Sequence, residues 1–352
     1  MWRASSGMVL LAALAGGAQG ADGVIVFGVI DIFAAHIRAD GAVSVARLDA
    51  SGLLASRIGV RGQEDLGDGY RASFMLEAGL DGDKGAQPDS NRLFNRQAWV
   101  GLSGAPGELR VGRQNTPHFY MNGKFDAFTS ATQASGWNNL FGPAPRADNS
   151  ISYIAPRMGR WLLQGMLARG ATGGGTPLPS LADNQSTHWT AEYDAPGAYF
   201  GANYQTVKRT GLPYMARRSA MGASWNFTPA WTLYGAAGRE TRSDDSQRDW
   251  VYSSSLRYRC AGLCSFSLGW AAFHDRLHGA GHGDARQWSA MAQQRLSTRT
   301  TLYAALAHLC QYGQRNSFAL LGAGVVAPDA QIRSPLPGGN LRGVQLGILH
   351  VF

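Results

Sequence analysis

The stretch STHWTAEYDAPGAYFGANYQTVK, residues 186–208, contains the pattern that decides the fold. Before its Pro-Gly turn, Trp189, Ala191 and Tyr193 alternate with more polar neighbours, and Phe200 and Tyr204 continue the alternation after the turn. Successive side chains of a β-strand point to opposite faces of a sheet. A period of two therefore predicts two antiparallel strands joined by a tight turn, each with one apolar face and one mixed face.

The same alternation recurs along the rest of the chain in segments of about ten residues, the length of a tilted strand that crosses a membrane. We predict sixteen strands, at residues 24–36, 52–63, 70–82, 91–103, 107–114, 148–156, 160–170, 186–194, 198–208, 215–226, 230–240, 248–260, 263–274, 285–296, 299–311 and 339–352. An even number suits a closed barrel, and closure is required in lipid because lipid cannot satisfy an open sheet edge.

The connections between these strands alternate between short turns and long polar loops. Asp194–Gly197 and Asn226–Pro229 are short turns with Pro or Gly, whereas residues 170–186 and 277–284 are longer and Gly-rich. This alternation is typical of an all-β transmembrane antiparallel barrel, with its short turns in the periplasm. A secreted β-sandwich would also alternate, but it would turn its apolar face inward and its polar face to solvent. The many aromatic side chains on one face of the strands and the polar side chains on the other favour the barrel.

The beginning of the chain predicts export. Arg3 supplies a positive charge, residues 8–15 are apolar, and small residues close the segment before Ala21, as in a signal peptide. We therefore expect a signal peptide at residues 1–20 and a barrel domain at residues 21–352. No later stretch approaches the roughly 20 apolar residues of a membrane helix. An exported chain without a helical anchor fits an outer-membrane location.

The chain is basic, with a formal net charge of +8, but it does not resemble a nucleic-acid-binding protein. Only three of its 32 basic residues are Lys, and the 29 Arg residues are scattered singly through the alternating segments. Clustered Lys residues or basic tails would be expected for a nucleic-acid partner, so none is predicted. Arg instead suits sites where a planar cation must keep its charge and its place.

Several motifs resemble those of the general diffusion porins of Gram-negative bacteria, most closely the beta-proteobacterial type. These motifs are GVID (28–31), SRIGVRGQEDLG (56–67), FMLEAG (74–79), RLFNRQAWVGL (92–102), VGRQ (111–114), RADNSISY (146–153) and the terminal Phe352. Together they are specific, and the resemblance covers essentially the whole chain after the signal peptide. It is densest in the first half.

The resemblance implies a sixteen-stranded barrel that assembles as a homotrimer in the outer membrane, in contact with lipid and lipopolysaccharide. It implies that the long third loop, residues 115–147, folds into the lumen as a constriction loop, and that Phe352 is read by the barrel assembly machinery. The implied function is passive diffusion of small hydrophilic solutes and ions.

The alternation of side chains between the two faces of a strand places charged side chains on the inner face, independently of the family resemblance. Ile58 faces outward in its strand, so Arg57 faces inward, and the same alternation turns Glu77 inward. We expect Trp99 to face outward. Arg96 lies three residues earlier, on the opposite face of the strand, and is therefore expected to face inward. A pore selects by its width and by the charges that line its narrowest point, so these residues are candidates for the selectivity site.

The resemblance implies a fuller constriction. In it, three arginines form a basic ladder on the wall, and two carboxylates complete the ring: Arg57, Arg96, Arg146, Glu77 and Asp126 of the loop. Ala127 follows Asp126, where the family often has proline. Opposed charges create a transverse field that disfavours apolar solutes, and three arginines against two carboxylates predict a preference for small anionic or polar solutes.

The remaining motifs indicate no covalent chemistry, cofactor or metal. Cys260 and Cys264 flank a short turn and form either a small disulfide, in an oxidising compartment, or two free thiols. His274, His278 and His282 recur every four residues but lie in a Gly-rich segment that makes a poor helix, so a metal site is not expected. The alternatives to a general porin are a substrate-specific porin for an organic anion and a structural or adhesin barrel. A structural barrel needs neither inward charges nor a long third loop.

Overall fold

A computed structural model of the protein describes residues 23–129, 132–142, 145–169, 185–208, 211–277, 283–320 and 332–352. The predicted signal peptide, residues 1–20, lies outside the described residues. None of the helices in these ranges is long and apolar enough to cross a membrane.

The described residues consist mainly of strands. In chain order the elements are β1 (Gly23–Ala39), β2 (Val45–Ala50), β3 (Arg57–Gly67), β4 (Tyr70–Gly79), β5 (Gln97–Gly104), β6 (Gly107–Asn115), α2 (Pro117–Asn122), α3 (Gly136–Phe141), β7 (Arg146–Ile154), β8 (Trp161–Ala168), β9 (Ser186–Ala195), β10 (Ala198–Lys208), β11 (Met215–Asn226), β12 (Trp231–Arg242), β13 (Arg248–Arg259), β14 (Cys264–Asp275), β15 (Ala285–Arg295), β16 (Thr300–Gln311) and β17 (Leu341–Val351).

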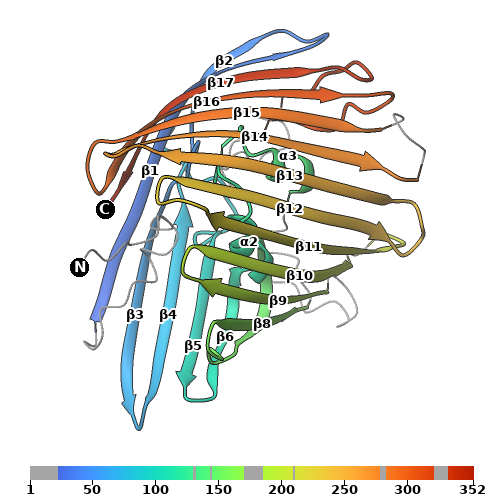
Figure 1. Ribbon diagram of the computed structural model, residues 1–352. Helices are drawn as coiled ribbons and strands as arrows, with labels where there is room; N and C mark the ends of the chain where they lie inside the picture. Colours follow the sequence, from blue (N-terminus) through green and yellow to red (C-terminus); the bar gives the residue numbers. More distant parts are fainter. Residues whose placement is uncertain are drawn as a thin grey trace.

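The strands form one closed antiparallel barrel (Figure 1). From β3 onward each strand pairs with the next strand in the sequence, and β17 pairs back with β1 over the register Val29–Val351 to Ala39–Leu341. β2 and β3 share one position in the wall, because β2 pairs with the second half of β1 and β3 with its first half. The seventeen strands of the described residues thus occupy sixteen positions, which confirms the predicted barrel.

The second wall position is interrupted, and the sequence prediction of a strand at 52–63 was wrong there. Residues 51–56 bend inward instead, because the Asp31 carboxylate accepts hydrogen bonds from the backbone N–H groups of Leu53 and Leu54 at 2.6 and 2.7 Å. The hydroxyl of Tyr303, on β16, donates to the same carboxylate at 2.6 Å. Satisfied amides and two buried leucine side chains favour this bend over a continuous strand.

The predicted strand at 91–103 also begins too early, since β5 starts at Gln97. Residues 91–96 form turns before it, and the Asn95 side chain accepts a hydrogen bond from the Gly79 N–H at 2.7 Å. This contact ties the turn to the end of β4. Most other predicted strands agree with the structure within a few residues, and β10 agrees at both ends.

The two faces of the wall have the polarity expected of a barrel that stands in lipid. In β9, Trp189 is 57% exposed, whereas the alternating Glu192 is 7% exposed. In β10, Phe200 and Tyr204 are exposed and Gln205 is fully buried. Apolar side chains therefore point outward and polar side chains inward, the reverse of a soluble sandwich.

The connection between β6 and β7 contains α2 and α3. It lies against the inner side of the wall formed by β8–β10 and β13–β15. α2 contacts β8, β9 and β10, and α3 contacts β13, β14 and β15. Figure 1 shows both helices within the space that the strands enclose. A buried apolar cluster holds them there, with Met121, Phe125 and Trp137 from the connection packed against Tyr199 and Val251 of the wall.

The two cysteines of the CAGLC turn between β13 and β14 are joined. Cys260 and Cys264 form a disulfide, which resolves the alternatives left open by the sequence. Cys310 on β16 is a free thiol.

Candidate functional site

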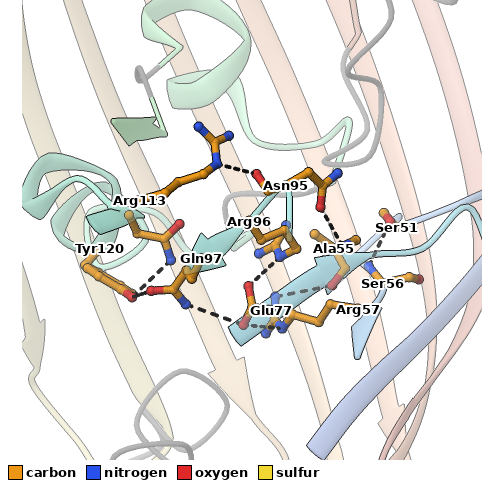
Figure 2. A network of polar contacts seen from close by, with 12 residues as sticks. Ser51, Ala55, Ser56, Arg57, Glu77, Asn95, Arg96, Gln97, Arg113 and Tyr120 are labelled. Carbon is orange, nitrogen blue, oxygen red and sulfur yellow. Dashed lines mark hydrogen bonds and ion pairs between the residues drawn. The ribbon is translucent and has the colours of Figure 1, made fainter. Parts of the chain in front are cut away.

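The centre of the candidate site is Glu77, near the end of β4. Its carboxylate pairs with the Arg96 Nε at 2.5 Å and with the Arg57 Nε at 3.7 Å. Arg57 is the first residue of β3 and Arg96 the last residue before β5, so the carboxylate sits between two arginines from neighbouring strands (Figure 2). All three side chains are less than 9% exposed. Buried charges of this kind need partners on every side.

A chain of hydrogen bonds connects this group to the third loop. Gln97 donates to Glu77 at 3.5 Å and accepts from the hydroxyl of Tyr120, a residue of α2, at 3.3 Å. Asn115, at the end of β6, donates to the same hydroxyl at 3.0 Å. Figure 2 shows Tyr120 pointing toward Gln97. The basic group and the beginning of the loop are therefore held in one polar network.

A second carboxylate stands beside this group on β7. Asp148 pairs with Arg113 of β6 and with Arg92 of the turn before β5. The Arg113 Nε donates to the Asn95 backbone oxygen at 2.8 Å. Gly112 has φ +130°, and the register of β6 and β7 shifts between Gly112 and Gln114, at the position of Arg113. Neither Arg113 nor Asp148 was identified from the sequence, although both lie inside quoted motifs, because the register shift breaks simple parity.

Arg146 opens β7, opposite Asn115 of β6. It lies near enough to interact electrostatically with Glu77, Arg57, Arg96 and Arg113. Its Nε is buried and has no hydrogen-bond partner among the described residues. The structure thus brings together four of the five predicted site residues: Arg57, Glu77, Arg96 and Arg146.

The expectation that Trp99 faces outward was wrong. Trp99 pairs with Met75 and lies on the same face as Gln97 and Glu77, and its indole N–H donates to Gln97 at 3.2 Å. The guanidinium of Arg110 lies over its ring at 4.4 Å. Arg96 nonetheless reaches Glu77, because it belongs to the turn before β5 and not to the strand whose parity was used.

Asp126, the fifth predicted site residue, lies apart from this group. Its carboxylate accepts from Ser135 at 2.7 Å and from the Phe128 N–H at 2.8 Å. The arginine that acts on it is Arg257 of β13, which also donates to the Ala127 backbone oxygen. Burial raises the pKa of Asp126 to about 6. Its contacts fix the loop to the wall, and its part in selecting solutes stays a prediction.

The loop packs against glycines on the inner face of β11 and β14. Phe125 packs on Gly222 of β11 and Phe128 on Gly269 of β14, where any Cβ would collide with the ring. His118 of α2 also anchors the loop, with its Nδ1 2.7 Å from the Asn203 Oδ1 of β10. Burial lowers the pKa of His118 to about 3, so this imidazole is neutral at physiological pH.

The group as a whole carries excess positive charge. Arg57, Arg96, Arg113 and Arg146 contribute +4 and Glu77 and Asp148 contribute −2, so these six side chains have a formal net charge of +2. Such a group attracts anions and repels cations over several ångströms. No cluster of three or more His, Cys, Asp or Glu residues that could hold a metal ion occurs in the described ranges.

Comparisons with known proteins agree with the fold. A family model described as Gram-negative porin matches residues 7–312. Outer membrane porin protein 32 of Delftia acidovorans is 30% identical over 379 residues, with 98% of this chain and 99% of that protein covered. An outer membrane porin protein of Bordetella pertussis is 36% identical over 164 residues, 42% of this chain and 43% of that protein.

A solved structure titled anion-selective porin from Comamonas acidovorans superposes with a TM-score of 0.78. It is 27% identical in sequence, and the comparison covers 94% of this chain and all of that one.

Proposed function

Because the chain belongs to the Gram-negative porin family, we propose that it is an anion-preferring member, whose selectivity is set by the basic group around Glu77. The protein is an outer-membrane channel for passive diffusion of small hydrophilic solutes and ions. We assign it no covalent chemistry. The solved structure of similar fold, the anion-selective porin from Comamonas acidovorans, supports the anion preference.

The observation that carries the proposal is the excess of arginine at the place where the third loop joins the wall. Arg57 and Arg96 share one carboxylate, and Arg146 adds a third cation beside them. In a water-filled constriction with low-dielectric walls, a few uncompensated charges bias which ions enter. The polar link from Gln97 to Tyr120 supports a narrowing at this level, with residues 115–147 as the constriction loop.

The same proposal includes the assembly and surroundings of the channel. We propose that three copies form the functional unit, that outer-membrane lipid and lipopolysaccharide surround it, and that Phe352 at the chain end is read by the barrel assembly machinery. Phe352 supports this with its exposed side chain and a backbone that exchanges hydrogen bonds with Gly28 at the barrel seam.

The test is ion selectivity in planar bilayers. The double variant Arg57→Glu with Arg96→Glu should lose anion preference, measured as the reversal potential in a potassium chloride gradient. Arg57→Gln with Arg96→Gln serves as a milder pair, with an intermediate shift expected. Arg217→Gln with Arg239→Gln, two exposed arginines on the outward face of β11 and β12, is the matched control and should leave selectivity unchanged. Unchanged selectivity in both inward pairs would remove Arg57 and Arg96 from the filter.

A further inference from the structure

Trp99 is a large apolar side chain on the polar inner face of the barrel. It lies on β5, two residues from Gln97 toward the short turn between β5 and β6, about 7 Å along the strand. Its side chain is partly exposed, and it belongs to none of the three buried apolar clusters of the described residues. Because the short turns of outer-membrane barrels are periplasmic, the indole faces the lumen on the periplasmic side of the basic group.

The indole is held from its edge and from one face. Its N–H donates to Gln97 at 3.2 Å, and the Arg110 guanidinium lies 4.4 Å from the centre of the ring. Glu108 fixes Arg110 in this place, since its carboxylate accepts from the Arg110 Nε and Nη2 at 2.7 and 3.0 Å. These polar groups set the orientation of the ring before any solute arrives. A ring that is already ordered binds a partner at a lower entropic cost.

The neighbouring positions leave apolar surface of the indole uncovered. Gly112 is directly opposite Trp99 on β6, and Gly101 is the next residue of β5 on the same face. Neither glycine has a side chain that could cover the ring. Met75, directly opposite on β4, adds an apolar side chain beside it. An exposed aromatic ring in this setting is a surface on which a flat apolar group of a passing solute can stack.

Arg146 is the arginine of the basic group that has no carboxylate of its own. The other three arginines pair with Glu77 or Asp148. Arg146 interacts electrostatically with Glu77 but forms no ion pair within the part of the chain that the structure describes, and its buried Nε has no hydrogen-bond partner there. A guanidinium with unused donors suits the carboxylate of a solute, which it can bind through two parallel hydrogen bonds.

One hydrogen-bond network connects the open ring with the unpaired cation. Arg146 lies opposite Asn115 across the β6–β7 pair, and Asn115 donates to the Tyr120 hydroxyl at 3.0 Å. Gln97 accepts from that hydroxyl at 3.3 Å and from the Trp99 indole (Figure 2). Arg146 and Trp99 stand on strands two apart, about 10 Å across the wall. Their long side chains cover part of this distance, and a small solute with a ring and a carboxylate can bridge the rest.

We propose that Trp99 and Arg146 form a subsite for small aromatic carboxylates, such as benzoate, on the periplasmic side of the constriction. The ring of the solute stacks on the open surface of Trp99, and its carboxylate pairs with Arg146. The inference deepens the proposed function, because it rests on an anion-preferring channel and names a class of solute for it. A neutral sugar is a poorer occupant, since it could stack on the indole but would offer no charge to Arg146.

The experiment measures how far benzoate reduces the chloride current of the wild-type channel in planar bilayers at neutral pH. Cyclohexanecarboxylate is the matched probe, because it has the same charge and nearly the same size but no aromatic ring. Benzoate should reach half-inhibition at an about three- to tenfold lower concentration, the ratio expected from one aromatic stacking contact. Trp99→Leu should abolish this difference, and Trp99→Phe should keep most of it.

Arg146→Gln should weaken inhibition by both acids about tenfold, because each loses its charge-assisted contact. Trp189→Leu, which removes an exposed outward tryptophan of β9, is the control and should retain the preference for benzoate. Equal half-inhibition by the two acids in wild type, or an unchanged ratio in Trp99→Leu, would overturn the proposal. Inhibition by glucose without inhibition by benzoate would also overturn it, and would assign the ring to neutral sugars.

Chloride preference is measured separately, as the reversal potential in a potassium chloride gradient without benzoate. A channel that favours chloride but does not distinguish the two acids would contradict the subsite alone. A channel that favours potassium but binds benzoate through Trp99 would contradict the proposed selectivity alone.

Discussion

Replacing Glu77 by glutamine tests whether the net positive charge around this residue sets the ion selectivity. The substitution should increase anion preference while making the barrel less stable. Glu77 is the shared partner of Arg57 and Arg96, and its loss raises the formal charge of the six-residue group from +2 to +3. Glutamine keeps the size of the side chain and one carbonyl acceptor. The change therefore isolates the charge.

The expected size of the selectivity change follows from Coulomb's law. An ion that passes about 6 Å from the altered charge in water gains or loses about 0.7 kcal/mol, roughly a threefold change. Anions and cations respond in opposite directions, so the permeability ratio should rise by about tenfold at low ionic strength. The Debye length of about 10 Å at 0.1 M salt reduces this, and a rise of about three- to fivefold is expected there.

Stability should respond in the opposite direction. Breaking a buried ion pair by removing one partner typically costs about 3–5 kcal/mol, because the other charge is left buried without compensation. With Arg57 and Arg96 both affected and the amide retaining some hydrogen bonding, we expect the free energy of unfolding to fall by about 3 kcal/mol. Urea unfolding followed by intrinsic tryptophan fluorescence measures this.

Glu108→Gln is the matched control for selectivity. Glu108 pairs with Arg110 at 2.7 Å at the turn end of β6, away from the loop, and it is partly exposed. The same unit of charge is removed there, but selectivity should change by less than half as much. A fall in anion preference in Glu77→Gln, or equal effects of the two variants, would refute the placement of the filter at Glu77.

Three further predictions concern the loop, its aspartate and the disulfide. Gly222→Val and Gly269→Val should displace Phe125 and Phe128, costing about 1–3 kcal/mol of stability and raising single-channel conductance; unaltered conductance in both would contradict the seating of the loop. The folded-state pKa of Asp126, about 6, lies above its ordinary 3.8, so the folded protein binds the extra proton and stability should fall as pH rises from about 4 to 6. That loss, about 3 kcal/mol, should vanish in Asp126→Asn, and urea midpoints across this range measure it. Replacing Cys260 and Cys264 by serine opens a five-residue loop and should cost no more than about 2 kcal/mol, with conductance unchanged in bilayers.

The sequence was sufficient for the barrel because alternation is a local property of each strand. Trp189 and Glu192 already have opposite polarity in the printed sequence, and the structure turns them to opposite faces. The interruption at 51–56 was not predictable in this way. It depends on Asp31, about twenty residues away in sequence, and on Tyr303 from the other end of the chain.

The candidate site was partly predictable for the same reason. Arg57 and Glu77 lie in regular strands, where parity holds, and both are where it placed them. Arg96 was placed correctly through a mistaken orientation of Trp99, and Arg113 was missed because it lies at a register shift. The place of Asp126 is set by Ser135 and Arg257, contacts across a loop that no periodicity describes.

The measurement that tests the central claim most directly is single-channel recording of the purified wild-type protein in a planar bilayer with a potassium chloride gradient. The basic group around Glu77 predicts a reversal potential that favours chloride, and a trimer predicts conductance steps in groups of three. A reversal potential that favours potassium, or no conductance from correctly folded protein, would contradict the account.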